Sequence, residues 1–216
     1  MDEEITRDHF EQSSWDERYG GEGRVWSGRP NAVLVTEATG LAPGRALDLG
    51  CGEGGDAIWL AEQGWQVVAV DFSEAGLARA AEHAAERGVA DRVEWRHADL
   101  RTWTPGDERF DLVTSCFLHL LDHGMLDATR QMAAAVAPGG TLLVAGHHPD
   151  DEHTGLRWSL PGVMLTAEEL LPAVDPEQFE VRAEARQRTE RGHDHHGDGH
   201  GEVHTVTDAV LVAVKK

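Results

Sequence analysis

The sequence has little cysteine, few basic residues and no long apolar run, and each shortage excludes a class of protein. The two cysteines, Cys51 and Cys116, are not spaced as a C-x-x-C pair, so we expect no disulfide framework and a cytoplasmic location. The 19 basic and 39 acidic residues leave a net charge of −20. Because binding to nucleic acid or to an anionic membrane needs a basic surface, neither partner is expected.

No apolar run approaches the ~20 residues of a membrane helix, and the first residues do not have the pattern of a signal peptide. What remains is a chain of 216 residues, 40% of them hydrophobic, which suits a single domain with a substantial core. Its expected partner is a small molecule.

Strand-like and helical segments alternate from residue 45 onward. Strands are expected at 45–49, 66–70, 92–96, 110–116 and 141–145, and helices at 56–63, 73–88 and 122–136. This alternation predicts a doubly wound, parallel α/β sheet with helices on both faces. Two further helices are expected before it, at 8–20 and 30–38. Two strands after it, at 179–188 and 203–214, predict an antiparallel hairpin.

A glycine-rich turn follows the first expected strand. Asp48, Gly50, Gly52 and Gly54 alternate there, and Asp71 lies 23 residues after Asp48 at the end of the second strand. Glycine lets a backbone bend sharply and lets a ligand approach it closely. Glycines under a ligand and a distal carboxylate for ribose hydroxyls are the arrangement of a nucleotide site in an α/β protein.

Ligands of such sheets bind beyond the carboxyl ends of the strands. Asp71 can accept two ribose hydroxyls, Phe72 can lie against the adenine ring, and Asp99 can accept from the adenine amino group. The residues expected to bind the cofactor are Tyr19, Trp26, Asp48, Gly50, Cys51, Gly52, Asp71, Phe72, Ala98, Asp99, Leu100 and Ser115.

Five motifs carry a family resemblance, at residues 47–54, 68–73, 97–100, 110–115 and 138–144. On these motifs the chain resembles the class I S-adenosylmethionine-dependent methyltransferases, most closely the small tellurite-resistance and thiopurine-type enzymes. The resemblance implies S-adenosyl-L-methionine as cofactor. Asp48, Gly50 and Gly52 would approach its methionine part, Asp71 its ribose and Asp99 its adenine. The exit of the fourth strand, at 115–119, would border the substrate.

The same resemblance implies a Rossmann-like seven-stranded sheet, mostly parallel, with an antiparallel C-terminal hairpin. We expect one methyltransferase domain over residues 1–216. It would comprise a helical lid segment at 1–44, a cofactor-binding core at 45–146, and a substrate and histidine-rich region at 147–216.

An aromatic segment precedes the first strand and contains Trp15, Tyr19 and Trp26. In the family that the chain resembles, such a segment folds over the cofactor as a lid, and aromatic faces suit a sulfonium cation. The alternative is that these side chains only pack the helix onto the sheet.

The sequence has thirteen histidines, and several follow expected strands. His119 follows the fourth strand and His147 and His148 the fifth, so the fold should bring them toward the hairpin loop. Histidine is the commonest nitrogen ligand for transition metals, which makes a Zn, Ni, Fe or Mn site one interpretation. An ordinary polar loop and metal-free general bases are the others. The expected ligands are His147, His148, His193, His195, His196 and His200, and the expected catalytic residues are His119 and His148.

The sequence therefore predicts methyl transfer to a sulfur, nitrogen or oxygen atom of a small molecule, with metal assistance as an option. An NAD-type oxidoreductase and a non-catalytic metal-binding protein are the alternatives. The protein is expected to be a monomer or a homodimer.

Overall fold

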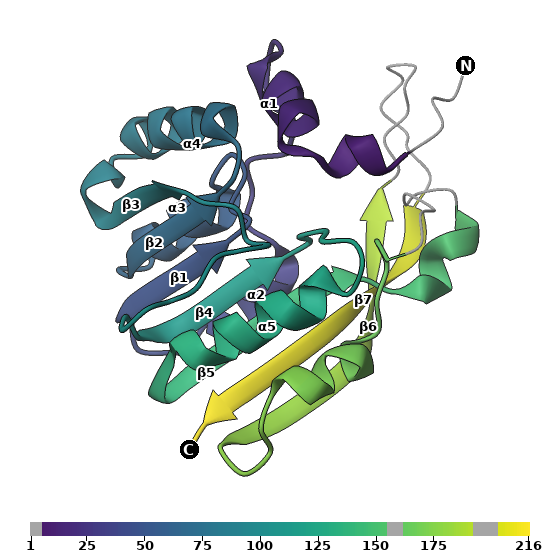
Figure 1. Cartoon of the computed structure of the whole chain (residues 1–216). Helices are drawn as coiled ribbons and strands as arrows, with labels where there is room; N and C mark the ends of the chain where they lie inside the picture. Colours follow the sequence, from purple (N-terminus) through teal and green to yellow (C-terminus); the bar gives the residue numbers. More distant parts are fainter. Residues whose placement is uncertain (1–5, 155–161, 192–202) are drawn as a thin grey trace.

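The computed structural model describes residues 6–154, 162–191 and 203–216 of the chain, which form one seven-stranded sheet (Figure 1). The strand order is β3-β2-β1-β4-β5-β7-β6. The strands are β1 (Arg45–Leu49), β2 (Gln66–Asp71), β3 (Val93–His97), β4 (Phe110–Cys116), β5 (Val136–His147), β6 (Phe179–Arg191) and β7 (Val203–Lys215). The first five are parallel, and β7 is antiparallel to both β5 and β6. The predicted fold class is confirmed.

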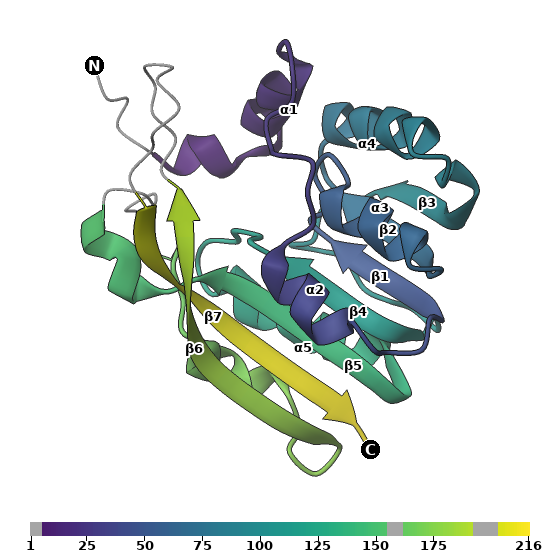
Figure 2. The same cartoon turned by 180° about the vertical axis from the view of Figure 1, so that it is seen from behind.

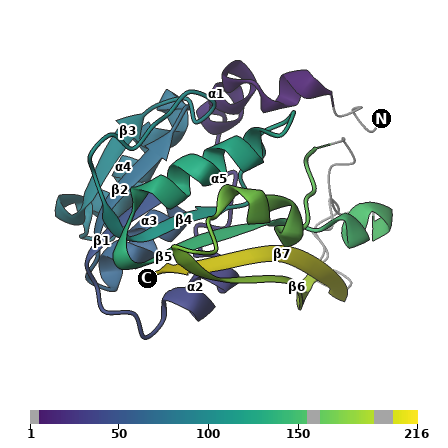
Figure 3. The same cartoon turned by 60° about the horizontal axis from the view of Figure 1, so that its bottom comes forward.

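Helices cover both faces of the sheet (Figure 2). One face carries α2 (Ala32–Ala38), α3 (Gly55–Glu62) and α4 (Glu74–Glu86). The other carries α5 (Gly124–Ala135) and the 3-10 helix η4 (Ala167–Ala173), which lie side by side in Figure 3. The remaining elements are α1 (Gln12–Gly20) and three short 3-10 helices, η1 (Arg7–Phe10), η2 (Ala90–Arg92) and η3 (Pro149–Thr154).

The central strands are apolar on both sides because both faces are covered. Leu47 and Leu49 point into the core under α5, whereas Ala46 points into the core under α2 and α3. On β2, Val68 and Val70 likewise point into the core under α5, whereas Val67 and Ala69 point into the core on the other face. A parallel sheet buried on both faces reads as continuous apolar runs, which is what made these strands recognisable in the sequence.

The start of β5 differs from the prediction. It begins at Val136, five residues before the expected Thr141, and includes the Pro-Gly-Gly sequence that lies between the expected helix and the expected strand. A bulge accommodates these residues, because Phe110 pairs with Val136 whereas Leu112 pairs with Thr141. Gly139, with φ of +78°, adopts the backbone conformation that the bulge needs. Likewise, the helix expected at 8–20 is divided into η1 and α1.

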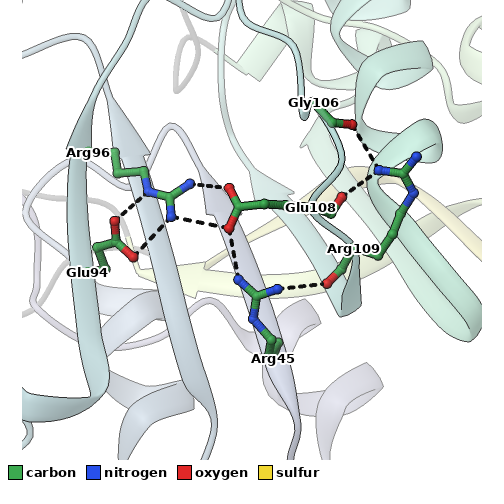
Figure 4. A network of polar contacts seen from close by, with 6 residues as sticks. All are labelled: Arg45, Glu94, Arg96, Gly106, Glu108 and Arg109. Carbon is green, nitrogen blue, oxygen red and sulfur yellow. Dashed lines mark hydrogen bonds and ion pairs between the residues drawn. The ribbon is translucent and has the colours of Figure 1, made fainter.

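The connection from β3 to β4 contains no helix, and a network of charges holds it against the sheet (Figure 4). Glu108 of this connection pairs with Arg45 at the start of β1 and with Arg96 on β3. Arg96 also pairs with Glu94 at 2.7 Å. The two arginines lower the pKa of Glu108 to about 2. Arg45 and Glu108 lie near the amino ends of β1 and β4, away from the glycine-rich turn at the other end of β1.

The hairpin of β6 and β7 extends beyond the end of β5. His147, the last residue of β5, is level with Asp208, and the hairpin continues for five further pairs. Therefore β6 ends at the same edge as the carboxyl ends of the parallel strands, as predicted. Across the described parts of the chain, the model has no helix with the length and apolar character needed to cross a membrane.

Candidate cofactor and acceptor site

The glycine turn, residues 50–54, connects β1 to α3 and has the backbone that the sequence predicted. Gly50 and Gly52 have φ angles of +76° and +50°, which side chains strongly disfavour. The amides of Gly50 and Cys51 donate to the carbonyl of Val70 at 2.8 and 3.1 Å, so the turn is fixed to the end of β2. A Cβ atom on Gly52 would lie 2.7 Å from the hydroxyl of Tyr19.

Asp71, the last residue of β2, is oriented toward this turn by two backbone amides. One carboxylate oxygen accepts from the Gly52 amide at 2.8 Å and the other from the Ser73 amide at 2.9 Å. Since each carboxylate oxygen has two lone pairs, each can still accept from a ribose hydroxyl. Only 6% of Asp71 is exposed, and burial raises the pKa of its carboxyl group.

Asp48 lies beneath the same turn, and one of its carboxylate oxygens, Oδ2, is buried without a hydrogen-bond partner among the described residues. Burial raises its pKa well above the ordinary value, and the nearby carboxylates of Asp56 and Asp71 raise it further. A buried polar atom without a partner costs free energy, so such an atom is often explained by a ligand. Asp48 is therefore an acceptor suited to a cationic group.

The residues that follow β2 and β3 lie at the same edge of the sheet and complete the cofactor side of the site. Asp99 accepts two bonds from the Arg101 side chain near 3 Å, which lowers the pKa of Asp99. Leu100 is buried in the core, and the amide of Ala98 donates to the Asp71 carbonyl. Phe72 is half-buried. The contact between Asp99 and adenine stays a prediction, because here its carboxylate is already held by Arg101.

The aromatic segment lies over the glycine turn. Tyr19 is 5% exposed and accepts a hydrogen bond from the Trp26 indole at 3.1 Å, while Trp15 stacks on Tyr19 with ring centroids 5.6 Å apart. Burial raises the pKa of the Tyr19 phenol. Figure 1 shows α1 beyond the carboxyl ends of β1 and β2, beside α4. The aromatic residues thus cover the turn itself and do not merely pack a helix against the sheet.

Polar contacts attach this N-terminal segment across the whole edge of the sheet. Asp16 accepts from the Ser73 hydroxyl at 2.6 Å, beside β2. Arg101 joins Glu11 at 3.1 Å, beside β3. Toward β4, Arg7 pairs with Asp122, and Phe10 packs edge-on against His119 with centroids 6.0 Å apart. The segment therefore spans the cofactor side and the opposite side of the site.

The exits of β4 and β5 meet on that opposite side, as the sequence predicted. The rings of His119 and His147 stack with centroids 5.4 Å apart, and Phe117 lies 4.7 Å from His147. Phe117 has φ of +60°, a conformation that non-glycine residues rarely adopt and that is often found at functional sites. His148 points toward Asp150, with 3.5 Å between the imidazole Nδ1 and the carboxylate.

The side chain of Ser115 makes a contact within the protein, and its contact with the cofactor stays a prediction. Its side chain is fully buried, and its hydroxyl donates to the carbonyl of Leu49 at 2.8 Å. This bond holds β4 to the end of β1, immediately before the glycine turn. Burial also raises the pKa values of the Cys51 and Cys116 thiols, so neither is suited to act as a thiolate.

The described residues contain no group of three histidine, cysteine or acidic side chains placed to hold a metal. His147 and His148 belong to that part of the chain, so the metal site is not supported there. The other expected ligands, His193, His195, His196 and His200, lie outside the described residues.

The sequence analysis did not identify two acidic residues in and after the glycine turn as important. Glu53 is buried and accepts the backbone amides of Val25 and Trp26, each at 3.0 Å. Asp56 accepts from the backbone and side chain of Asn31 at 2.7 and 2.8 Å. Both therefore bind the N-terminal segment. The sequence contained one signal for this role: both acidic residues lie beside apolar positions of the helix expected there. A buried charge at such a position needs a partner.

Comparison with known proteins agrees with this geometry. The family model described as a methyltransferase domain matches residues 46–140. Over 136 residues the chain is 34% identical to trans-aconitate 2-methyltransferase of Streptomyces avermitilis, covering 60% of this chain and 50% of that protein. Over 150 residues it is 31% identical to thiocyanate methyltransferase 1 of Arabidopsis thaliana, covering 67% and 65%. The chain thus spans less than two thirds of the length of these relatives.

A similar solved structure comes from work on the conversion of a disulfide bond into a thioacetal group during echinomycin biosynthesis. It has a TM-score of 0.73 and 21% identity, covering 95% of this chain and 92% of that one. At this identity the likeness shows the fold alone. With the glycine turn, Asp71 and the sheet order, these matches show that the chain belongs to the class I S-adenosylmethionine-dependent methyltransferases.

Proposed function

We propose that the protein transfers the methyl group of S-adenosylmethionine to a small molecule at the carboxyl edge of its sheet. The observation that carries this proposal is Asp48 Oδ2, which is buried without a hydrogen-bond partner in the part of the chain that the structure describes, beneath a glycine turn that Tyr19 covers. The cofactor has an ammonium group, which would supply the missing partner. The residues present therefore fit it.

The cofactor roles follow from the positions of the side chains. Asp48 would hold the ammonium group, Asp71 the ribose hydroxyls, and the backbone of Gly50 and Gly52 would lie against the methionine part. Phe72 and Asp99 would flank the adenine ring. Tyr19 and Trp26 would exclude water above it, together with the backbone of Cys51. When bound, the cofactor supplies an electrophilic methyl group, and the protein supplies position and desolvation.

His119 is the residue we assign to proton removal from the acceptor. It follows β4 and is kept in place by the rings of His147 and Phe10. A neutral imidazole can accept the proton of a hydroxyl or amine as the methyl group is transferred. His148, held by Asp150, is the second candidate base.

Sulfur is the acceptor atom to test first. Two relatives that match about two thirds of this chain or more are named a thiocyanate methyltransferase and a probable thiol methyltransferase. A thiolate is nucleophilic without a base, whereas a hydroxyl or amine needs one. Methyl transfer to a panel of small thiols, phenols and amines should therefore be measured with the wild-type protein and with H119A.

We expect H119A to lower the rate with phenol or amine acceptors by roughly 10²-fold or more, as for loss of a general base. The rate with an ionised thiol should fall by less than about threefold. An equal fall for every acceptor would contradict the assignment of His119 as a base. Failure of the wild-type protein to bind S-adenosylmethionine, with tight binding of NAD instead, would overturn the proposed function itself.

Metal assistance by the histidine-rich loop is the finer part of this proposal. Its support is the histidine content of residues 193–200. Metal analysis of the untagged protein, with activity measured before and after chelation, tests it directly.

The net charge of −20 supports a free small molecule, and not nucleic acid, as acceptor.

A further inference from the structure

The loop from Gly21 to Trp26 is held by an ion pair that the cofactor roles do not use. Glu53, in the glycine turn, and Arg79, on α4, are joined at 3.1 Å between Oε1 and Nη1. The Glu53 side chain is 4% exposed and that of Arg79 is 20% exposed. Removing one partner from such a buried pair leaves an uncompensated charge, so the pair acts as a unit.

The two members of the pair bind opposite kinds of backbone groups. Glu53 Oε2 accepts the amides of Val25 and Trp26, both at 3.0 Å. Arg79 donates to the carbonyls of Gly21 and Gly23. The loop is thus fixed through its donors and its acceptors at once. Hydrogen bonds to charged groups are about twice as strong as those between neutral groups, so this attachment is strong for so short a loop.

The same loop determines the position of the residues over the cofactor site. Trp26 is attached to Glu53 through its amide and donates from its indole to Tyr19. The Tyr19 hydroxyl in turn lies where a Cβ atom of Gly52 would be, within the glycine turn. A continuous series of contacts therefore connects the ion pair to the surface that faces the cofactor.

We propose that Glu53 and Arg79 are positioning residues that keep the aromatic segment closed and thereby set the affinity for the cofactor. The inference rests on the proposed function only for its cofactor measurement. In E53Q, the amide has one acceptor where the carboxylate had two. Whichever way it is turned, either Arg79 or the two backbone amides lose their acceptor, and the loop should be released.

Trypsin cleavage measures this release directly. Trypsin cuts after Arg24, and the amide of the bond that it cuts belongs to Val25, which donates to Glu53. Arg24 is exposed and pairs with Glu86 only at 3.9 Å, so trypsin can reach its side chain, and the backbone attachment restrains the bond that would be cut. We expect E53Q to be cleaved after Arg24 at least tenfold faster than wild type, with the 25–216 fragment identified by mass spectrometry. S-adenosylhomocysteine should bind E53Q about tenfold more weakly. The KM for S-adenosylmethionine should rise similarly, while kcat at saturation changes less than threefold.

E62Q is the matched control. Glu62 on α3 and Arg87 just after α4 form a similar pair at 2.6 Å, and no hydrogen bond or ion pair joins them to the described part of the N-terminal segment. E62Q should leave both cleavage and cofactor affinity unchanged. R79Q removes the more exposed member of the ion pair. It should cause the same faster cleavage and weaker cofactor binding as E53Q. The double variant E53Q/R79Q should differ from the stronger single variant by less than about threefold, since the two residues act as one unit.

Wild-type rates of cleavage after Arg24 in folded E53Q and R79Q, with unchanged affinity for S-adenosylhomocysteine, would overturn the inference. Equal effects in E62Q would overturn it too, because they would reveal a general loss of stability. If wild type binds no S-adenosylhomocysteine, the proposed function fails, whereas the cleavage comparison still decides whether the pair holds the loop.

Discussion

Asp48 offers a sharp prediction, because its removal should improve stability and impair binding at the same time. D48N keeps the size and shape of the side chain but removes a buried negative charge near Asp56 and Asp71. The oxygen without a partner is the atom that the proposal assigns to the cofactor. A residue with a purely structural role should not produce gain and loss together.

The magnitudes follow from the burial of this carboxylate. A buried polar group without a partner costs about 1–3 kcal/mol, and more when charged. Since D48N removes the buried charge and its repulsion from Asp56 and Asp71, we expect a net gain of about 1–2 kcal/mol in the free energy of unfolding at neutral pH. For a chain of this length that is roughly 2–8 °C in Tm. Loss of a hydrogen bond to the charged ligand group should weaken cofactor binding by roughly 10–100-fold.

The pH dependence of the stability difference has a defined sign. The folded pKa of Asp48 is raised above the ordinary 3.8, so ionisation of this residue disfavours the folded state. Below about pH 4 the carboxyl is protonated in both states, and D48N should match the wild-type protein. As the pH rises toward and through the folded pKa, the advantage of D48N should grow and then level off.

Thermal melting from pH 4 to 8 and calorimetric titration with S-adenosylhomocysteine measure both effects. D56N is the matched control, because both oxygens of Asp56 are bonded by Asn31 and the substitution should lower stability. If D48N melts below wild type at every pH, or binds the cofactor with unchanged affinity, the assigned role of Asp48 is refuted.

Three further predictions concern other parts of the molecule. D71A should weaken cofactor binding roughly 10–100-fold in a calorimetric titration, and unchanged affinity would remove Asp71 from the ribose site. Replacing His195 and His196 by alanine should abolish one-equivalent metal binding in elemental analysis, whereas retained metal would place its ligands elsewhere. E108Q should cost only about 0.5 kcal/mol at pH 7, because the pair is half-exposed and screened. The Glu108 pKa is lowered from 4.5 to about 2, so chemical unfolding should show this difference above pH 4.5 and lose it as the pH falls toward 2.

The parallel part of the sheet was largely predictable because β1, β2 and β4 are short and apolar, and helices follow most of the parallel strands. The ranges expected for β1 and β4 agree with the structure. The predicted start of β5 was wrong because Pro138 and the two glycines after it are residues typical of a loop. Pairing with β4 across a bulge overrides that signal. Local propensity is weak compared with the hydrogen bonds of a central ladder.

The candidate site was predictable where one motif supplies its parts. Gly50, Gly52 and Asp71 meet because the end of each strand places its next residue at the same edge of a parallel sheet. The convergence of His119 and His147 follows from the same rule, since β4 and β5 are neighbours.

The sequence by itself therefore determined the fold class, the family resemblance and the edge of the sheet where ligands bind, because these depend on patterns within short stretches. Only the tertiary structure decided which acidic residues keep a free oxygen at the candidate site and which hold the protein together. Among the described residues, Asp48 Oδ2 is left without a hydrogen-bond partner, whereas Glu53 receives Arg79 and the backbone amides of Val25 and Trp26, 28 and 27 positions earlier in the chain. The pairing of a buried charge depends on neighbours distant in sequence, and no local pattern encodes them.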